Sequence, residues 1–112
     1  MFRAEARSKI EEELARGAQA RRDGFEGRAR VCARRAAGAA IREYMALKGL
    51  PASGPSAYDL LAGLQDEPSL SAQMRQAIER LLARVDENYT LPADVDLLED
   101  ARWLAAELER HV

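Results

Sequence analysis

Cysteine and histidine are almost missing from this chain of 112 residues, since each occurs once, as Cys32 and His111. A single cysteine cannot form an intramolecular disulfide, and a zinc-type metal site needs a cluster of Cys and His ligands. A nucleophilic cysteine needs a base nearby, but the only histidine is the penultimate residue. The sequence therefore predicts no metal and no cofactor, with Cys32 as a small buried apolar residue.

Long apolar runs are also lacking. No stretch approaches the roughly 20 apolar residues of a membrane span, and the first seven residues are charged throughout, unlike the apolar core of a signal peptide. We therefore expect a cytoplasmic protein that does not associate with a membrane. Valine and isoleucine are scarce, whereas alanine, leucine, arginine and glutamate are abundant. This composition favours helices over strands, and the length suits a single domain over residues 1–112.

The rest of the chain is expected to pack around one long helix at residues 25–47. At 100° per residue, its small and apolar residues share one broad face: Phe25, Ala29, Ala33, Ala36, Ala37, Ala40, Tyr44 and Leu47. A second seam carries Val31, Gly38 and Met45 at heptad spacing. A helix that is apolar on two sides needs two neighbours, so it is either central in a bundle or shared with a dimer interface. For the interface we predict Val31, Gly38, Met45 and Trp103, because an outward tryptophan is typical of protein contacts.

Four further helices follow from the apolar periodicity and from the residues that begin and end helices. The first covers about residues 4–22, with a thin apolar stripe, a frayed start and an exposed acidic run at residues 11–13. The others are a short helix after Ser56, one from Ser69 or Ser71 to about Tyr89 with Val85 in its core stripe, and one starting at Asp94 or Asp96. The predicted fold is all-α: an antiparallel four-helix bundle with one additional short helix.

Charge is distributed unevenly along the chain, whose net charge is −2. Residues 21–48 carry eight basic and three acidic side chains, whereas residues 49–112 carry five basic and twelve acidic ones. The simpler interpretation is internal: the arginines of the long helix face carboxylates of later helices or of a second subunit. The alternative is an anion site, because arginine presents a two-pronged donor to phosphate. The acidic balance argues against DNA as a partner.

If the long helix binds an anion, its charged flank supplies the candidate residues. Arg35 and Arg42 are seven positions apart, with Arg28 further back on the same flank and Arg34 beside Arg35. Tyr58 is a candidate stacking group from the short helix. The predicted ligand-binding set is therefore Arg28, Arg34, Arg35, Arg42 and Tyr58, for a nucleotide or RNA.

Three passages resemble the HEPN-domain family of prokaryotic helical bundles: GRARVCARRAA at residues 27–37, SAYDLL at 56–61, and 91–104, which begins LP and ends DLLEDARWL. The resemblance implies a bundle of four or five helices, frequent homodimers, and either RNA cleavage or nucleotide-related binding. It also implies a minimal nucleotidyltransferase as a partner, because HEPN proteins are often found beside one.

The sequence departs from this family at its catalytic motif. Ribonuclease members carry an arginine followed four to six residues later by a histidine, and a dimer pairs two such motifs. Here His111 follows Arg102 by nine residues and Arg110 by one, so no position matches. The leading hypothesis is a non-catalytic, dimeric binding or interaction module. The alternative is an atypical, metal-independent ribonuclease of a toxin-antitoxin-like system that uses Arg102 and His111 across a dimer.

Overall fold

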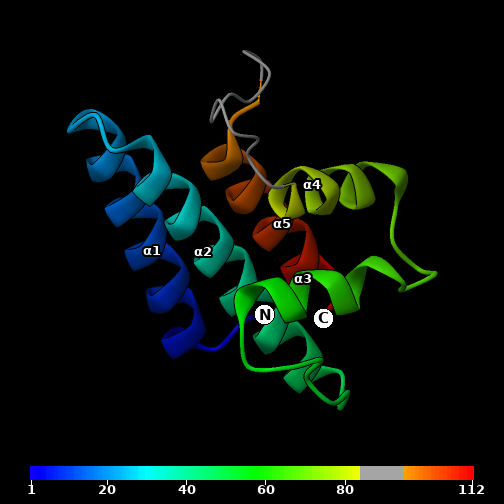
Figure 1. Ribbon diagram of the computed structural model, residues 1–112. Coiled ribbons are helices and arrows are strands. Elements are labelled where there is room, and N and C mark those ends of the chain that lie inside the picture. Colours follow the sequence, from blue (N-terminus) through cyan, green and yellow to red (C-terminus); the bar gives the residue numbers. More distant parts are fainter. Residues whose placement is uncertain (84–94) are drawn as a thin grey trace.

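The computed structural model describes residues 1–83 and 95–112 (Figure 1). These residues form helices and no strand, which confirms the all-α prediction for this part of the chain. The finer prediction, a HEPN-like four-helix bundle with one short helix, stays a prediction. The helices are α1 (Ala4–Arg22), α2 (Glu26–Leu47), α3 (Ala57–Gln65), α4 (Ala72–Leu82) and α5 (Leu97–Arg110).

Helix α2 is the central element and contacts each of the other four helices. Five alanines of its predicted apolar face are completely buried: Ala29, Ala33, Ala36, Ala37 and Ala40. Such small side chains let neighbouring helices approach closely. The two ends of the predicted face are exposed instead, because Phe25 precedes the first helical residue and Leu47 is the last one. The core therefore gathers around the middle of α2.

Side-chain caps begin three of the helices. Ser56 Oγ accepts a hydrogen bond from the Asp59 amide at 3.0 Å, which confirms Ser56 as the start of the short helix. Ser71 caps α4 and Asp96 caps α5 in the same way. The structure therefore selects the later residue of each predicted pair, Ser69 or Ser71 and Asp94 or Asp96. Each cap satisfies an amide that the first helical turn leaves without an intrahelical partner.

Helix α4 ends at Leu82, earlier than its apolar periodicity predicts. The backbone of Ala83 is not helical, and residues 84–94, including Val85 and the predicted end near Tyr89, lie outside the described residues. Arg34 of α2 binds the carbonyls at this helix end: its Nε donates to Leu81 at 2.7 Å and its Nη2 to Ala83 at 2.9 Å. An arginine from another helix therefore satisfies carbonyls that lack partners at the end of α4.

The start of α1 is held by hydrogen bonds to α2 and α5. The expectation of a frayed start, which rested on the thin apolar stripe, is therefore wrong. Phe2 is buried, and its amide donates to Glu109 Oε2 of α5 at 2.7 Å. The Arg3 amide donates to Glu43 Oε2 of α2, also at 2.7 Å. These contacts join residues 40 and 107 positions apart, so no local pattern in the sequence predicts them.

Candidate functional site

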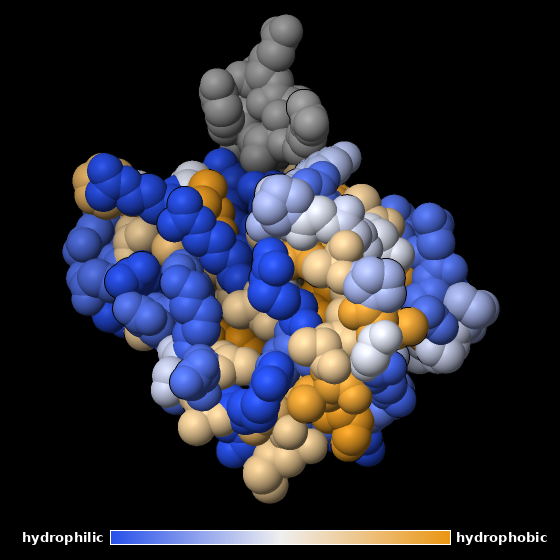
Figure 2. All heavy atoms as spheres, turned by 90° about the horizontal axis from the view of Figure 1, so that it is seen from below, coloured by the Kyte–Doolittle hydropathy of each residue, from blue (hydrophilic) through white to orange (hydrophobic). Residues whose placement is uncertain are grey.

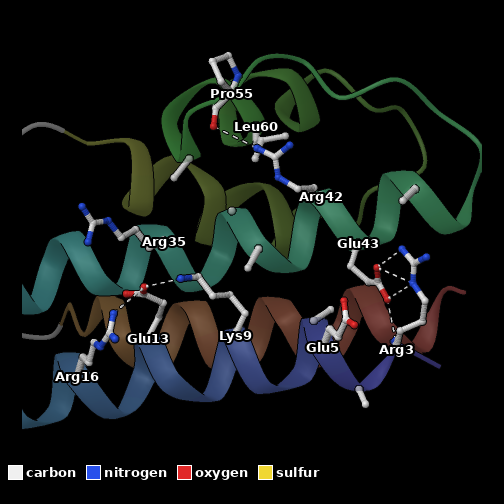
Figure 3. A pocket seen from close by; sticks show the side chains of 16 residues that line it. Arg3, Glu5, Lys9, Glu13, Arg16, Arg35, Arg42, Glu43, Pro55 and Leu60 are labelled. Atoms are coloured by element: carbon white, nitrogen blue, oxygen red, sulfur yellow. Dashed lines mark hydrogen bonds and ion pairs between the residues drawn. The ribbon is translucent and has the colours of Figure 1, made fainter.

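An open groove of about 1070 Å³ runs between α1, α2 and α3 (Figure 3). Small residues of α2 form part of its wall, namely Gly38, Ala39 and Ala46. Ala39 and Ala46 have no side chain beyond Cβ and so occupy little of the groove, whereas Gly38 lets α3 approach α2 closely. Ligand sites in proteins commonly enclose roughly 300–1,000 Å³, so this groove has the capacity for a small-molecule ligand.

Arg3 and Glu43 lie at one end of the groove and are bound to each other. Arg3 Nη2 lies 2.6 Å from Glu43 Oε1, and Arg3 Nε donates to both carboxylate oxygens. The Glu43 side chain is buried, and the hydrogen bonds from Arg3 lower the pKa of its carboxyl below the ordinary value. This pair is structural, since each group already holds an opposite charge.

A second buried carboxylate, Glu13 of α1, lies in the wall of the same groove. Its Oε1 lies 3.3 Å from Lys9 Nζ and 3.6 Å from Arg16 Nη1. Its Oε2 is buried and has no hydrogen-bond partner among the described residues. Figure 3 shows the Glu13 carboxylate between α1 and α2, with the ends of Lys9 and Arg16 on either side.

Arg35 and Arg42 border the groove from α2. Arg42 Nη2 donates to the Pro55 carbonyl at 3.1 Å and so reaches toward the segment before α3. Arg35 is exposed, and no hydrogen bond or ion pair joins it to any described residue. The groove therefore borders a guanidinium whose donors are open to solvent.

A smaller hollow of about 610 Å³ lies between α1 and α2 and shares Arg16 and Arg35 with the groove. Its wall includes Arg28, whose guanidinium carbon lies 4.7 Å from the centre of the Phe25 ring. That distance is typical of a cation–π contact. Three of the predicted ligand residues, Arg28, Arg35 and Arg42, thus follow one flank of α2 along two adjoining hollows.

The other two predicted ligand residues lie elsewhere. Arg34 is half-buried, binds the end of α4, and has a pKa lowered first by burial and then by the charge of Arg30. Tyr58 is exposed on α3 and does not line the groove, although Ala57 beside it does. The structure therefore brings together three of the five predicted residues.

Internal pairing of the α2 arginines with carboxylates, the simpler interpretation of the charge pattern, is not found among residues 1–83 and 95–112. Arg34 and Arg42 bind backbone carbonyls instead. The two glutamates of α2 pair with arginines from the N-terminal segment and α1, as Glu26 with Arg21 and Glu43 with Arg3. The carboxylates of α2 are therefore paired with cations from the N-terminal segment and α1, whereas Arg34 and Arg42 of α2 bind backbone carbonyls.

The four predicted interface residues do not form one surface. Val31 is 43% exposed and lines the hollow between α1 and α2. Gly38 is buried, and a Cβ there would lie 2.9 Å from Ala57 Cβ, so its small size serves the contact with α3. Met45 and Trp103 are partly buried against the core, with Trp103 at a hollow between α4 and α5.

Exposed apolar side chains occur at separate places. Phe25 and Val31 lie at the start of α2, whereas Leu47 and Leu50 lie at its far end. A helix of 22 residues spans about 33 Å, so the two groups are well separated. Figure 2 shows the face seen from below, where hydrophilic side chains alternate with weakly hydrophobic ones and strongly hydrophobic atoms form several separate patches.

Both residues of the alternative ribonuclease hypothesis are exposed. Arg102 lies 3.8 Å from Glu99 on α5, and His111 directly follows the last residue of that helix. Within the described ranges, no group of three or more Cys, His, Asp or Glu side chains is arranged to hold a metal ion. No helix in those ranges has the length and apolarity to cross a membrane.

The sequence patterns missed Glu13, which was expected in an exposed acidic run. A usable signal is present: Glu13 follows Ile10 by three positions and precedes Gly17 by four, and both of these are buried. Residues at such spacing share a helix face. The position thus pointed inward, although three consecutive glutamates are usually typical of solvent exposure.

No protein-family model, no curated protein and no solved structure matches this chain. A functional conclusion therefore depends on the groove and its side chains, together with the resemblance of the three passages described above.

Proposed function

We propose that this chain is a non-catalytic, HEPN-like helical bundle that acts as a cytoplasmic binding module, with an anionic ligand of nucleotide size in the groove between α1, α2 and α3. The observation that carries this proposal is Arg35, an exposed guanidinium at the groove with no partner among the described residues. Arg28 and Arg42 extend the same flank of α2 in both directions.

The charges of the groove favour an anion. Its two buried carboxylates are offset by cations, Glu43 by Arg3 and Glu13 by Lys9 and Arg16. The guanidiniums of α2 have no such offset among the described residues. Arginine binds phosphate and carboxylate through two parallel hydrogen bonds, so a phosphate group is a suitable ligand for Arg35.

The size and charge of the molecule favour a compact ligand over a long nucleic acid. The groove holds about 1070 Å³, while extended nucleic acid is bound through many cations along its backbone. A net charge of −2 disfavours that mode of binding. A nucleotide concentrates its negative charge at one end, which one or two arginines can neutralise.

Calorimetry with AMP, ATP and a short single-stranded RNA at low salt tests this proposal. We expect the unmodified protein to bind at least one of them, and Arg35→Gln to weaken that binding about tenfold or more, because a charge-assisted hydrogen bond is lost. Arg110→Gln is the matched control, since Arg110 is exposed at the end of α5 and paired with Glu107. No heat with any of the three ligands would refute the anion site.

The homodimer and a nucleotidyltransferase partner are proposals that rest on the family resemblance. Sedimentation equilibrium tests the dimer, because one chain has a mass of 12.4 kDa. A measured mass of a single chain at concentrations up to about 100 µM, well above the micromolar range of ordinary weak association, would reject it. Co-purification with a nucleotidyltransferase encoded by a neighbouring gene tests the partner.

A further inference from the structure

Glu13 is a buried carboxylate with one oxygen unused. Its side chain is 2% exposed, and both Lys9 and Arg16 approach the same oxygen, Oε1. Oε2 is left without a hydrogen-bond partner among the described residues. Buried polar atoms in native proteins nearly always have a partner, and each exception needs a reason. A ligand in the groove that donates a hydrogen bond to Oε2 would explain why this oxygen has no partner in the protein.

The position of Glu13 fits that role. It lines the same groove as Arg35, and Figure 3 shows its carboxylate between α1 and α2. Lys9 and Arg16, which flank it, are both more than half exposed, at 55% and 57%. Long exposed side chains change rotamer within nanoseconds, so these two can shift when a ligand enters.

The charges around Glu13 indicate that the donor group of the ligand is neutral. Two cations already offset its negative charge, so a third cation would gain little and would be repelled by both of them. A neutral hydroxyl or amino group donates a hydrogen bond without that repulsion. The thiol of Cys32 interacts with the Glu13 side chain, but a thiol is only a weak donor, and Oε2 itself has no hydrogen-bond partner among the described residues.

We propose that Glu13 Oε2 accepts a hydrogen bond from a neutral hydroxyl or amino group of the ligand whose anionic group binds Arg35. The groove then selects phosphorylated compounds that also carry a neutral donor, with a nucleoside monophosphate as the example, over a bare phosphate. This inference rests on the proposed function, because it assumes that an anion binds at Arg35.

Glu13→Gln tests the inference with two probes, AMP and methyl phosphate, titrated by calorimetry at pH 8. Methyl phosphate is then a dianion with no donor of its own. The glutamine oxygen is expected to face Lys9 and Arg16, which places its NH₂ group where Oε2 was. An amino group of the ligand would then meet a second donor, and a hydroxyl would exchange a charge-assisted hydrogen bond for a weaker neutral one. We expect the ratio of the AMP affinity to the methyl phosphate affinity to fall about tenfold or more.

Glu12→Gln is the matched control, because Glu12 is the neighbouring residue and its ion pair with Arg16 is about half exposed. This variant should keep the affinity ratio of the unmodified protein. The ratio is the relevant quantity, since removal of any negative charge near the groove strengthens binding of both anions alike.

The outcomes separate the inference from the proposed function. If both probes bind and the ratio is the same in Glu13→Gln as in the unmodified protein, the inference is overturned while the anion site stands. If neither probe binds, the inference is overturned, and the proposed function fails with it when ATP and the short RNA give no heat either. If Glu13→Gln does not fold, Glu13→Asp retains the charge but withdraws the oxygens by one methylene. The ratio should then fall as well, and an unchanged ratio would overturn the inference.

Discussion

Arg34 and Leu81, 47 positions apart in the chain, are joined by a hydrogen bond of 2.7 Å from the arginine Nε to the leucine carbonyl. The same guanidinium reaches the Ala83 carbonyl, so one side chain of α2 holds the C-terminal end of α4. A positive charge at this end also interacts favourably with the helix dipole. Arg34 therefore stabilises the fold, whereas Arg35, its neighbour in the sequence, faces solvent.

Arg34→Gln should lower the free energy of unfolding by about 1–3 kcal/mol, because two charge-assisted hydrogen bonds are lost, a part-buried one to the Leu81 carbonyl and an exposed one to the Ala83 carbonyl. Urea unfolding followed by circular dichroism measures the change. Arg35→Gln is the control and should change stability by less than about 0.5 kcal/mol, as exposed substitutions usually do. Equal losses in both variants would contradict the role assigned to Arg34.

Gly38→Ala should destabilise the protein, because the new Cβ would lie 2.9 Å from Ala57 Cβ and 3.0 Å from Ala57 Cα. Forcing α2 and α3 apart costs about 1–3 kcal/mol, as overpacking generally does. Gly27→Ala is the matched control: among the described residues, its Cβ would come within 4 Å of Arg30 Nη2 alone, at 3.8 Å. It should gain up to about 1 kcal/mol from helix propensity. Thermal melts of both variants test whether the melting temperature falls for Gly38→Ala and rises for Gly27→Ala.

Stability should fall as the pH falls below about 4.5, the ordinary pKa of a glutamate side chain. The pKa of Glu43 is lowered by its hydrogen bonds to Arg3, and that of Glu109 by the hydrogen bond from the Phe2 amide. Since the unfolded chain then binds protons at a higher pH than the folded one, this stabilisation is complete above pH 4.5 and is lost as the pH falls through the lowered pKa values.

Urea unfolding at several pH values between 7 and 3 measures that loss. Glu43→Gln should be less stable at pH 7 and show a weaker decline toward low pH, because one of the two carboxyls no longer titrates. Glu12→Gln removes an exposed carboxyl and should keep the decline. A Glu43→Gln protein with the full pH dependence would mean that the Arg3 pair is not its source.

Cys32 should react slowly with iodoacetamide at pH 8. Burial raises the pKa of its thiol first, and the negative charge of Glu13 raises it further, so the reactive thiolate is depleted. The folded protein should therefore be alkylated more slowly than the urea-unfolded one, and Glu13→Gln should accelerate the reaction of the folded protein. Equal rates with and without Glu13 would contradict the proximity of the two groups.

His111→Ala should leave both stability and ligand binding unchanged, within about 0.5 kcal/mol, because His111 is exposed beyond the end of α5. The same variant tests the alternative function. If the purified protein cleaves RNA in a salt-sensitive way and His111→Ala abolishes that cleavage, the ribonuclease hypothesis replaces the binding module.

Sequence patterns predicted those features of the fold that depend on residues close together in the chain. The alanine face of α2 and the cap at Ser56 depend on residues three or four positions apart, and the structure confirms both. The extent of α4 was overestimated, because apolar periodicity continues past Leu82 whereas the described helix ends there. Apolar periodicity indicates which face of a helix is buried, but it does not indicate at which residue the helix ends.

The candidate site was predicted only in part, for a similar reason. Arg28, Arg35 and Arg42 share a flank of one helix, and helical spacing alone placed them together. Arg34 looked equivalent in the sequence, but α4 passes close enough to bind it. Glu13 looked exposed, but α2 covers it.

The sequence by itself determined that this chain is helical where the structure describes it, that Ser56 starts the short helix, and that the alanine face of α2 is buried. These features follow from interactions within one or two helical turns. Only the tertiary structure decided which charged groups are satisfied, since the partners of Arg34, Glu43 and Glu109 lie at least 40 positions away. That Arg35 and Glu13 Oε2 have no hydrogen-bond partner among the described residues likewise follows only from the tertiary structure, because partners can come from distant parts of the chain.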